Sequence, residues 1–288
     1  MNPRAKGYSL RMSRYRDLRL GGQTVQKHVR DIAKDAVVLA LAPELTRSGG
    51  QPLRVYESSA GTAFLSRQLA DQGHSVVISN YRLQGIPGVQ EVEADLNLAL
   101  PFADASFDCI LCREVIEHVE SVPHTLREFS RLLAPGGRLV LTFPNRLQIR
   151  SRLFYLLSGF YRGMKSPINL DVAFGEAHIN LLGYPEMDYF LRKAGFAVTG
   201  VSSSYFSAWD RLLAPLRLLV RAATLHALLR HKPRAEEHDK TRPANRAYNR
   251  YIADVLTAPE LFYGKDVIVS AVRVAEGQPS FPAPQAAE

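Results

Sequence analysis

Apolar residues change their spacing repeatedly along residues 53–143, and this pattern predicts a regular alternation of strands and helices. Short apolar or β-branched runs predict strands at residues 53–57, 75–79, 89–94, 107–112 and 138–143. Apolar positions recur at helical spacing over 62–70 and 123–133, and a short helical segment is predicted at 114–119. Strands that alternate with helices form βαβ units, so we expect a parallel sheet that helices cover on both faces.

The pattern changes after residue 150. Residues 151–160 and 184–194 have the spacing of helices, whereas residues 197–203 and 266–274 have the composition of two final strands. A long insertion separates these strands and includes a predicted helix at 209–230, with leucines on one side and arginines on another. Residues 275–288 are rich in proline and alanine, so we expect a disordered tail.

The turn after the strand at 53–57 is typical of a loop that binds a nucleotide cofactor. It ends a strand on an acid, Glu57, and opens a helix almost at once. Such loops usually carry three glycines, but this one has Ser59, Gly61 and Ala63. If Ser59 or Ala63 adopts the left-handed conformation, its Cβ atom costs roughly 1–2 kcal/mol.

Six blocks follow one another at defined spacing along residues 55–145. They are the loop at 55–63, Ala94-Asp95-Leu96, Leu100-Pro101-Phe102, Ser106-Phe107-Asp108, Glu114-Val115-Ile116-Glu117-His118 and Pro135-Gly136-Gly137. Together they resemble the class I S-adenosylmethionine-dependent methyltransferases, and within them the ubiquinone-pathway and glycan-associated branches. The resemblance implies an α/β fold with a doubly wound, mostly parallel seven-stranded sheet of Rossmann-like type. Its last strand would be antiparallel and preceded by a helical insertion.

The resemblance also implies where S-adenosylmethionine would bind. The methionine part would lie against Glu57, Ser59 and Gly61, the ribose against Asn80, and the adenine near Asp95 and Leu96, with Cys112 facing the cleft. Asn80 stands where the family has an acid, which predicts weaker binding because an amide offers one neutral acceptor oxygen. For Asp95 the alternative is a turn or helix-cap residue.

Three residues after the fourth predicted strand are candidates for chemistry. Glu114, Glu117 and His118 stand at i, i+3 and i+4, which places them on one face if the segment is helical. The catalytic candidates are Glu114, His118 and His178, and the metal candidates are Glu114, Glu117 and His118, which could bind Mg²⁺. Similar blocks occur in ubiquinone-pathway O-methyltransferases and small-RNA ribose methyltransferases. The alternative is that the block only orients its loop, as in metal-free members.

Charge is concentrated in two segments. Residues 1–30 carry eight Lys or Arg against one Asp, and residues 211–250 carry ten against three acids, whereas the chain as a whole has a net charge of +8. These segments indicate either solvated surface or contact with an anionic partner. We expect a basic arm at 1–30 and a methyltransferase domain at 31–274, with a basic helical insertion at 205–262.

The two cysteines, Cys109 and Cys112, lie in one apolar run, where strand alternation directs them to opposite faces. We expect two buried small apolar side chains rather than a metal or redox site. The amino-terminal segment lacks an apolar core, so it is not a secretory signal.

These observations favour an S-adenosylmethionine-dependent methyltransferase that modifies a hydroxyl of a small molecule, a glycan or a lipid-linked intermediate. The alternatives are a non-catalytic protein that keeps the fold and binds cofactor weakly, and a nucleic-acid methyltransferase. Methylation of nucleic acid is disfavoured because the basic segments lack interleaved aromatic residues. We expect a cytoplasmic protein, with residues 209–230 able to contact the anionic inner face of a membrane.

Overall fold

The fold comes from a computed structural model, which describes residues 15–20, 23–46, 50–161, 171, 177–180, 182–205, 208–230 and 243–274 of the 288. Residues 1–14 of the predicted amino-terminal arm and the whole predicted tail (residues 275–288) lie outside the described residues.

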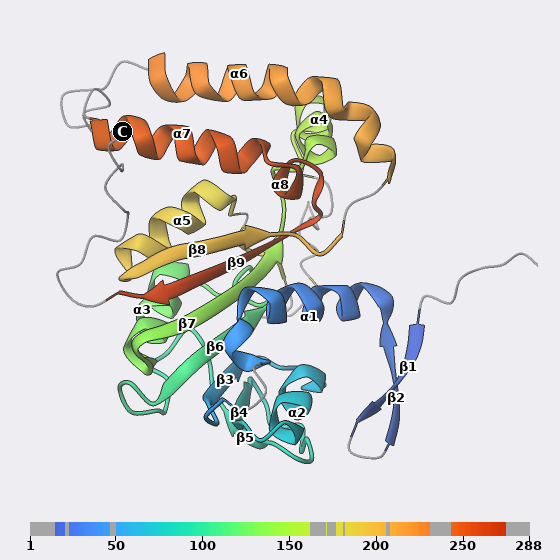
Figure 1. The fold of residues 1–288 in the computed structure, drawn as a ribbon, viewed down its shortest axis with the longest axis vertical. Coiled ribbons are helices and arrows are strands. Elements are labelled where there is room, and N and C mark those ends of the chain that lie inside the picture. Colours follow the sequence, from blue (N-terminus) through green and yellow to red (C-terminus); the bar gives the residue numbers. More distant parts are fainter. Residues whose placement is uncertain are drawn as a thin grey trace, which may run out of the picture.

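Seven strands form the central sheet, in the order β5-β4-β3-β6-β7-β9-β8 (Figure 1). They are β3 (Arg54–Ser58), β4 (Ser75–Asn80), β5 (Gln90–Glu93), β6 (Phe107–Arg113), β7 (Leu133–Pro144), β8 (Phe196–Ser202) and β9 (Asp266–Arg273). All neighbours pair in parallel except β9, which runs antiparallel to both β7 and β8. The predicted sheet, including its antiparallel last strand, is confirmed.

Helices cover both faces of this sheet. On one face α1 (Val29–Leu41), the 3-10 turn η1 (Pro43–Leu45) and α2 (Phe64–Asp71) bury Val38, Leu45 and Leu65 against alternate residues of β3 and β6. On the other face α3 (Val122–Leu132) and α5 (Tyr184–Lys193) pack against the remaining strand residues, with Phe129 and Leu191 fully buried. Two layers of helices around one sheet make the doubly wound arrangement that the strand–helix alternation predicts.

Cys109 and Cys112 confirm the strand alternation. Both side chains are free and buried, but Cys109 belongs to the core beneath α1 and α2, whereas Cys112 belongs to the core beneath α3 and α5. They therefore lie on opposite faces of β6, as expected for small apolar side chains.

Part of the basic amino-terminal segment is ordered. Strands β1 (Tyr15–Leu20) and β2 (Gln23–His28) form an antiparallel hairpin that leads directly into α1. The imidazole of His28 caps α1, because its Nδ1 accepts a hydrogen bond from the backbone N–H of Arg30 at 3.1 Å. The hydrophobic pattern did not reveal the hairpin or α1, although both contribute to the site described below.

The insertion before the last strand is helical, as predicted. It consists of η3 (Ala208–Leu213), α6 (Ala214–Arg230), α7 (Pro243–Thr257) and α8 (Pro259–Tyr263). Helix α4 (Ile149–Ser158) follows β7, and Figure 1 shows it beside this group, with α6 and α7 side by side. Because β7 and β8 both end just before these helices, the helices gather at the carboxyl edge of the sheet.

Candidate active site

The loop between β3 and α2 follows the path of a glycine-rich loop with only one glycine. Ser59, Gly61 and Ala63 all have positive φ angles, 47°, 55° and 50°. A non-glycine residue in this region costs roughly 1–2 kcal/mol, so Ser59 and Ala63 carry the backbone strain that their Cβ atoms predict. A Cβ atom at Gly61 would meet no protein atom within 4 Å, so the backbone there is open to a ligand.

This loop borders a cleft of about 780 Å³ at the carboxyl ends of the parallel strands. Its lining includes most of the residues predicted to bind cofactor or to act in catalysis, namely Ser59, Gly61, Asn80, Asp95, Leu96, Glu114 and His118. In open α/β sheets, ligands bind at this edge where the strand order reverses. Here that point lies between β3 and β6, because β4 and β5 continue to one side and β7 to the other.

Asn80, at the end of β4, is held by an acid that the sequence did not reveal. Its Nδ2 donates a hydrogen bond of 2.7 Å to Oε1 of Glu91, which lies on neighbouring β5. Backbone N–H groups of residues 84–86 also donate to Glu91, at 2.8–3.2 Å. These hydrogen bonds lower the pKa of Glu91, and the one from Asn80 has the largest effect. A carboxylate only accepts, so the amide nitrogen of Asn80 faces Glu91 and the amide oxygen is what Asn80 offers a ligand.

Asp95 follows β5 and combines two of the predicted roles. Its Oδ1 accepts hydrogen bonds from the backbone N–H and the side-chain amide of Asn97, both at 2.9 Å, which forms an Asx turn. Asp95 also lines the cleft. The same side chain therefore stabilises the turn and borders the cleft.

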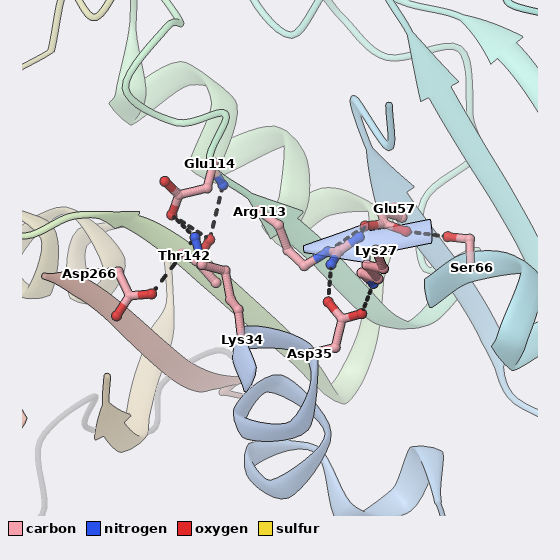
Figure 2. Close-up of polar contacts among 9 residues, drawn as sticks. All are labelled: Lys27, Lys34, Asp35, Glu57, Ser66, Arg113, Glu114, Thr142 and Asp266. Atoms are coloured by element: carbon pink, nitrogen blue, oxygen red, sulfur yellow. Dashed lines mark hydrogen bonds and ion pairs between the residues drawn. The ribbon is translucent and has the colours of Figure 1, made fainter. Parts of the chain in front are cut away.

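Glu57 and Cys112, which were predicted to meet the cofactor, do not line the cleft. Glu57 is buried, and it accepts hydrogen bonds from Ser66 and from Nε of Arg113, the latter at 2.5 Å. Figure 2 shows that Arg113 also reaches Asp35 of α1, at 2.5 Å, and that Asp35 pairs in turn with Lys27 of β2. Cys112 is fully buried, and burial raises the pKa of its thiol to about 12.

The predicted helix at 114–119 is wrong. Glu114 takes a left-handed conformation, with φ of 55°, directly after β6, and residues 116–118 form a turn. Its carboxylate therefore points toward α1 and β7, where it pairs with Lys34 at 2.9 Å and accepts a hydrogen bond from Thr142 at 3.0 Å (Figure 2). One residue with positive φ at the end of the strand is enough to separate Glu114 from Glu117 and His118.

Glu117, His118 and His178 form the cluster that the structure does bring together. One potential ligand atom of each lies within 4.8 Å of the others. The backbone explains why residues so distant in sequence meet: the N–H groups of Ile179 and Asn180 both donate to the carbonyl of Glu117, at 3.0 Å. The His118 and His178 rings stand edge to face, with centroids 4.6 Å apart.

The state of His118 follows from its contact with the main chain. Its Nδ1 lies 3.0 Å from the carbonyl oxygen of Ala177. A carbonyl only accepts, so Nδ1 carries the hydrogen, and in the neutral ring Nε2 keeps its lone pair. This Nε2 lies 4.0 Å from Oε1 of Glu117. The ring is thus fixed in the tautomer that a base or a metal ligand requires.

Glu117 is a buried acid whose carboxylate no other described residue compensates by a hydrogen bond. Neither of its carboxylate oxygens accepts a hydrogen bond from another residue in the described part of the chain. Burial, reinforced by the charge of Glu114, raises the pKa of Glu117 to about 8. A buried group in this state is costly to keep unless it serves a ligand.

Comparisons with known proteins agree with this geometry. Residues 56–141 match the family described as a methyltransferase domain. Over this segment the chain is similar to methyltransferase domains. The computed fold is also similar to a solved SAM-dependent methyltransferase from Archaeoglobus fulgidus, with a TM-score of 0.51, 12% identity, and coverage of 85% of this chain and 95% of that one. At this identity the likeness concerns the fold alone.

Curated methyltransferases resemble the same domain. The chain is 35% identical over 119 residues to a ubiquinone/menaquinone biosynthesis C-methyltransferase of Dinoroseobacter shibae. This match covers 38% of this chain and 46% of that protein. It is 31% identical over 104 residues to a ubiquinone biosynthesis O-methyltransferase of Xanthomonas oryzae, with coverage of 32% and 44%. The chain thus spans less than half the length of these relatives.

Sequence reasoning missed four charged residues around the candidate site. Lys27, Lys34 and Asp35 come from the hairpin and α1, which precede the methyltransferase blocks, and Glu91 lies in the middle of β5. Their only signal was that they are charged, which surface residues are as well.

Proposed function

We propose that this chain is an S-adenosylmethionine-dependent methyltransferase that modifies a hydroxyl group of a small molecule, a glycan or a lipid-linked intermediate. The observation that carries the proposal is His118, whose Nδ1 is anchored to a carbonyl and whose ring lines the cleft. Transfer to a hydroxyl requires removal of its proton near the transition state. A relative named as an O-methyltransferase supports the same acceptor class.

The residues of the cleft fit this cofactor. The loop at 59–63 has the backbone conformation that allows close approach of a ligand, and its one glycine leaves open space. The amide oxygen of Asn80 and the carboxylate of Asp95 are acceptors for ribose and adenine groups. When bound, S-adenosylmethionine supplies an electrophilic methyl group on a sulfonium.

Within this proposal His118 takes the proton of the acceptor hydroxyl at Nε2. The hydrogen bond to Ala177 holds the ring in place and stabilises the imidazolium that forms. The buried Glu117 and the edge-to-face ring of His178 lie beside the imidazole and limit its movement. The chain thereby aligns and deprotonates the acceptor, which are the contributions that methyl transfer needs from a protein.

A divalent cation also fits this cluster, and we propose it as the second role of the same residues. The orphaned carboxylate of Glu117 and the two imidazoles form a set of one oxygen and two nitrogen donors. Such a set favours Mn²⁺ or Zn²⁺ over Mg²⁺, which prefers oxygen ligands. A bound cation would lower the pKa of an acceptor hydroxyl. Since Nε2 of His118 cannot bind a cation and a proton at once, the two roles are separable.

Calorimetric titration with S-adenosylmethionine tests the cofactor. We expect saturable binding, and we expect Asp95→Ala to weaken it by about tenfold through loss of a charged acceptor. Asp104→Ala is the matched control, because Asp104 is an exposed acid that pairs with Arg131 outside the cleft. Absence of binding at millimolar cofactor would favour the non-catalytic alternative.

Thermal unfolding with Mn²⁺ tests the cation. A ligand that binds only the folded state at a hundredfold excess over its dissociation constant stabilises by about 2.7 kcal/mol. We therefore expect Mn²⁺ to raise the unfolding temperature of the wild-type protein and of His226→Ala, a control in an exposed histidine of α6, but not of His178→Ala. An equal response of the three proteins would exclude the cluster as the cation site and leave His118 as the base.

A further inference from the structure

Helix α4 exposes an apolar stripe instead of burying one. Leu153, Leu156 and Leu157 follow one another at i, i+3 and i+4, the spacing of one helical face. Leu156 is 78% exposed and Leu157 is 87% exposed. Phe154 and Tyr155, on the adjoining face, are also exposed. An apolar cluster of this kind marks an interaction site, whereas single exposed leucines would not.

Helix α6 repeats this arrangement. Its half-buried residues, Leu216, Val220, Thr224 and Leu228, recur every four positions. Its outward side is also apolar, with Leu218 and Leu219 strongly exposed, and Leu212 of η3 extends the same exposed set. A helix that is apolar on both sides is stable in contact with another apolar surface on each side.

The two exposed stripes belong to one unit. Ile149 of α4 packs in one cluster with Leu213, Leu216 and Val220 of η3 and α6, around Phe262 of α8. An ion pair between Arg150 and Asp210 joins the same elements. We call the exposed apolar residues of α4, η3 and α6 the apolar face.

Basic side chains surround the apolar face. Arg217 and Arg221 are exposed on α6 and lean toward α7, where they contact the carbonyl of Thr257 and the carboxylate of Asp254. Arg246 and Arg250 are exposed on α7. Asp254 is the one exposed acid among the described side chains of these two helices, so the border of the apolar face is positively charged.

We propose that the apolar face docks on the surface of an anionic lipid bilayer. Leucines that are this exposed project into solvent, so they suit a fluid apolar phase better than a folded partner of matching shape. Aromatic residues beside them suit the interfacial region, and the arginines suit anionic headgroups. None of the described helices has both the length and the hydropathy to cross a bilayer. A second copy of this chain would bring two positively charged borders together.

The position of the apolar face gives the docking a consequence for the site. The helices that carry it follow the carboxyl ends of β7 and β8, and the cleft lies at the carboxyl ends of the neighbouring strands. Docking therefore places the cleft at the membrane side of the sheet. This last step rests on the proposed function, and it favours a lipid-linked acceptor.

Vesicle co-sedimentation of the full chain tests the docking without any assay of methyl transfer. We expect the wild-type protein to pellet with vesicles of phosphatidylglycerol and phosphatidylcholine in equal amounts, and to pellet less at high salt. The double variant L156S/L157S should partition at least about tenfold more weakly, because two leucines no longer enter the apolar phase. Both residues are exposed, so the fold should be retained, which circular dichroism checks.

Leu98→Ser is the matched control, since Leu98 is 63% exposed in the turn after β5, away from the apolar face. It should pellet as the wild type does. Absence of wild-type pelleting, equal loss in both variants, or a dimer in solution that L156S/L157S abolishes would overturn the proposal. A wild-type protein that binds these vesicles but no S-adenosylmethionine would keep the docking and remove the proposed function.

Discussion

Two carboxylates, those of Glu57 and Glu117, are buried to a similar extent but differ in the groups that surround them. Glu57 at the end of β3 is 1% exposed, and Glu117 in the turn after β6 is 3% exposed. Glu57 is compensated by Arg113 and Ser66, and the network continues through Asp35 to Lys27. Glu117 has no donor from another described residue, only two imidazoles nearby.

The difference separates an acid with structural partners from an acid that the described residues leave uncompensated. Removing a carboxylate from water costs several kcal/mol unless charges and hydrogen bonds replace the water. Glu57 has these replacements and ties the hairpin, α1, β3 and β6 together. Glu117 lacks them, and its raised pKa shows that the cost is met by holding a proton instead.

The largest effect is expected from Arg113→Met, which leaves Glu57 buried without its cation. Breaking a buried pair in this way costs about 3–5 kcal/mol of unfolding free energy. Urea unfolding followed by circular dichroism measures it. Arg54→Met is the matched control, because Arg54 pairs with Asp108 at 2.7 Å near the surface, where a pair contributes at most about 1 kcal/mol.

The double variant E57Q/R113M sharpens this test. It removes the unpaired charge, so part of the lost stability should return. Equal losses for Arg113→Met and Arg54→Met would show that Glu57 is not the structural acid of the pair.

Glu117→Gln should instead raise the free energy of unfolding, by an amount that depends on pH. The ordinary pKa of a glutamate is 4.5, and that of Glu117 in the folded protein is about 8. Between these values the folded state binds more protons than the unfolded state, so wild-type stability falls as pH rises. Glutamine has no proton to lose, so the variant should gain roughly 3 kcal/mol over the wild type at pH 7 and little at pH 4. Urea unfolding at several pH values measures the difference.

Glu57→Gln is the control for that experiment, because it removes an acceptor from Arg113 and should destabilise near neutral pH. A constant difference between Glu117→Gln and the wild type across this pH range would contradict the account of Glu117.

Glu91 adds a third carboxylate to the comparison, one that is well hydrogen-bonded and acts through Asn80. Asn80→Asp alone places two acceptors at 2.7 Å and should weaken S-adenosylmethionine binding. In N80D/E91Q the new amide donates to the new carboxylate, which then offers a charged acceptor to the ribose. We expect this double variant to bind S-adenosylmethionine about tenfold more tightly than the wild type by calorimetry. Similar affinities for the single and double variants would exclude a positioning role for Glu91.

The smallest effects concern the strain beside Glu57. Ala63→Gly should stabilise less than Ser59→Gly, because it also removes a methyl group that is buried in the core beneath α1 and α2. Ser59→Gly relieves a left-handed Cβ but adds freedom to the unfolded chain, so it should stabilise by about 0.5–1 kcal/mol in urea unfolding. Ala60→Gly, in the same loop but without positive φ, should destabilise by about the same amount. Equal shifts in all three would mean that the loop is not strained.

The sequence alone predicted the elements whose signal is local. The strands and helices of residues 53–143 follow from hydrophobic spacing, and the strain at Ser59 and Ala63 follows from the residue types in a loop of known path. The opposite placement of Cys109 and Cys112 follows from strand alternation. Each of these depends on neighbours in the chain, which the sequence displays directly.

Only the tertiary structure decided which charged groups meet. The left-handed Glu114 directed its carboxylate to Lys34, and the hydrogen bonds from Ile179 and Asn180 to Glu117 brought His178 to His118 from a distant segment. The network of Glu57 likewise needed α1 and the hairpin. Periodicity reports local backbone conformation, whereas ion pairs and ligand clusters depend on distances between segments remote in sequence. For that reason the fold and the cofactor loop were predictable, and the partners of Glu57 and Glu117 were not.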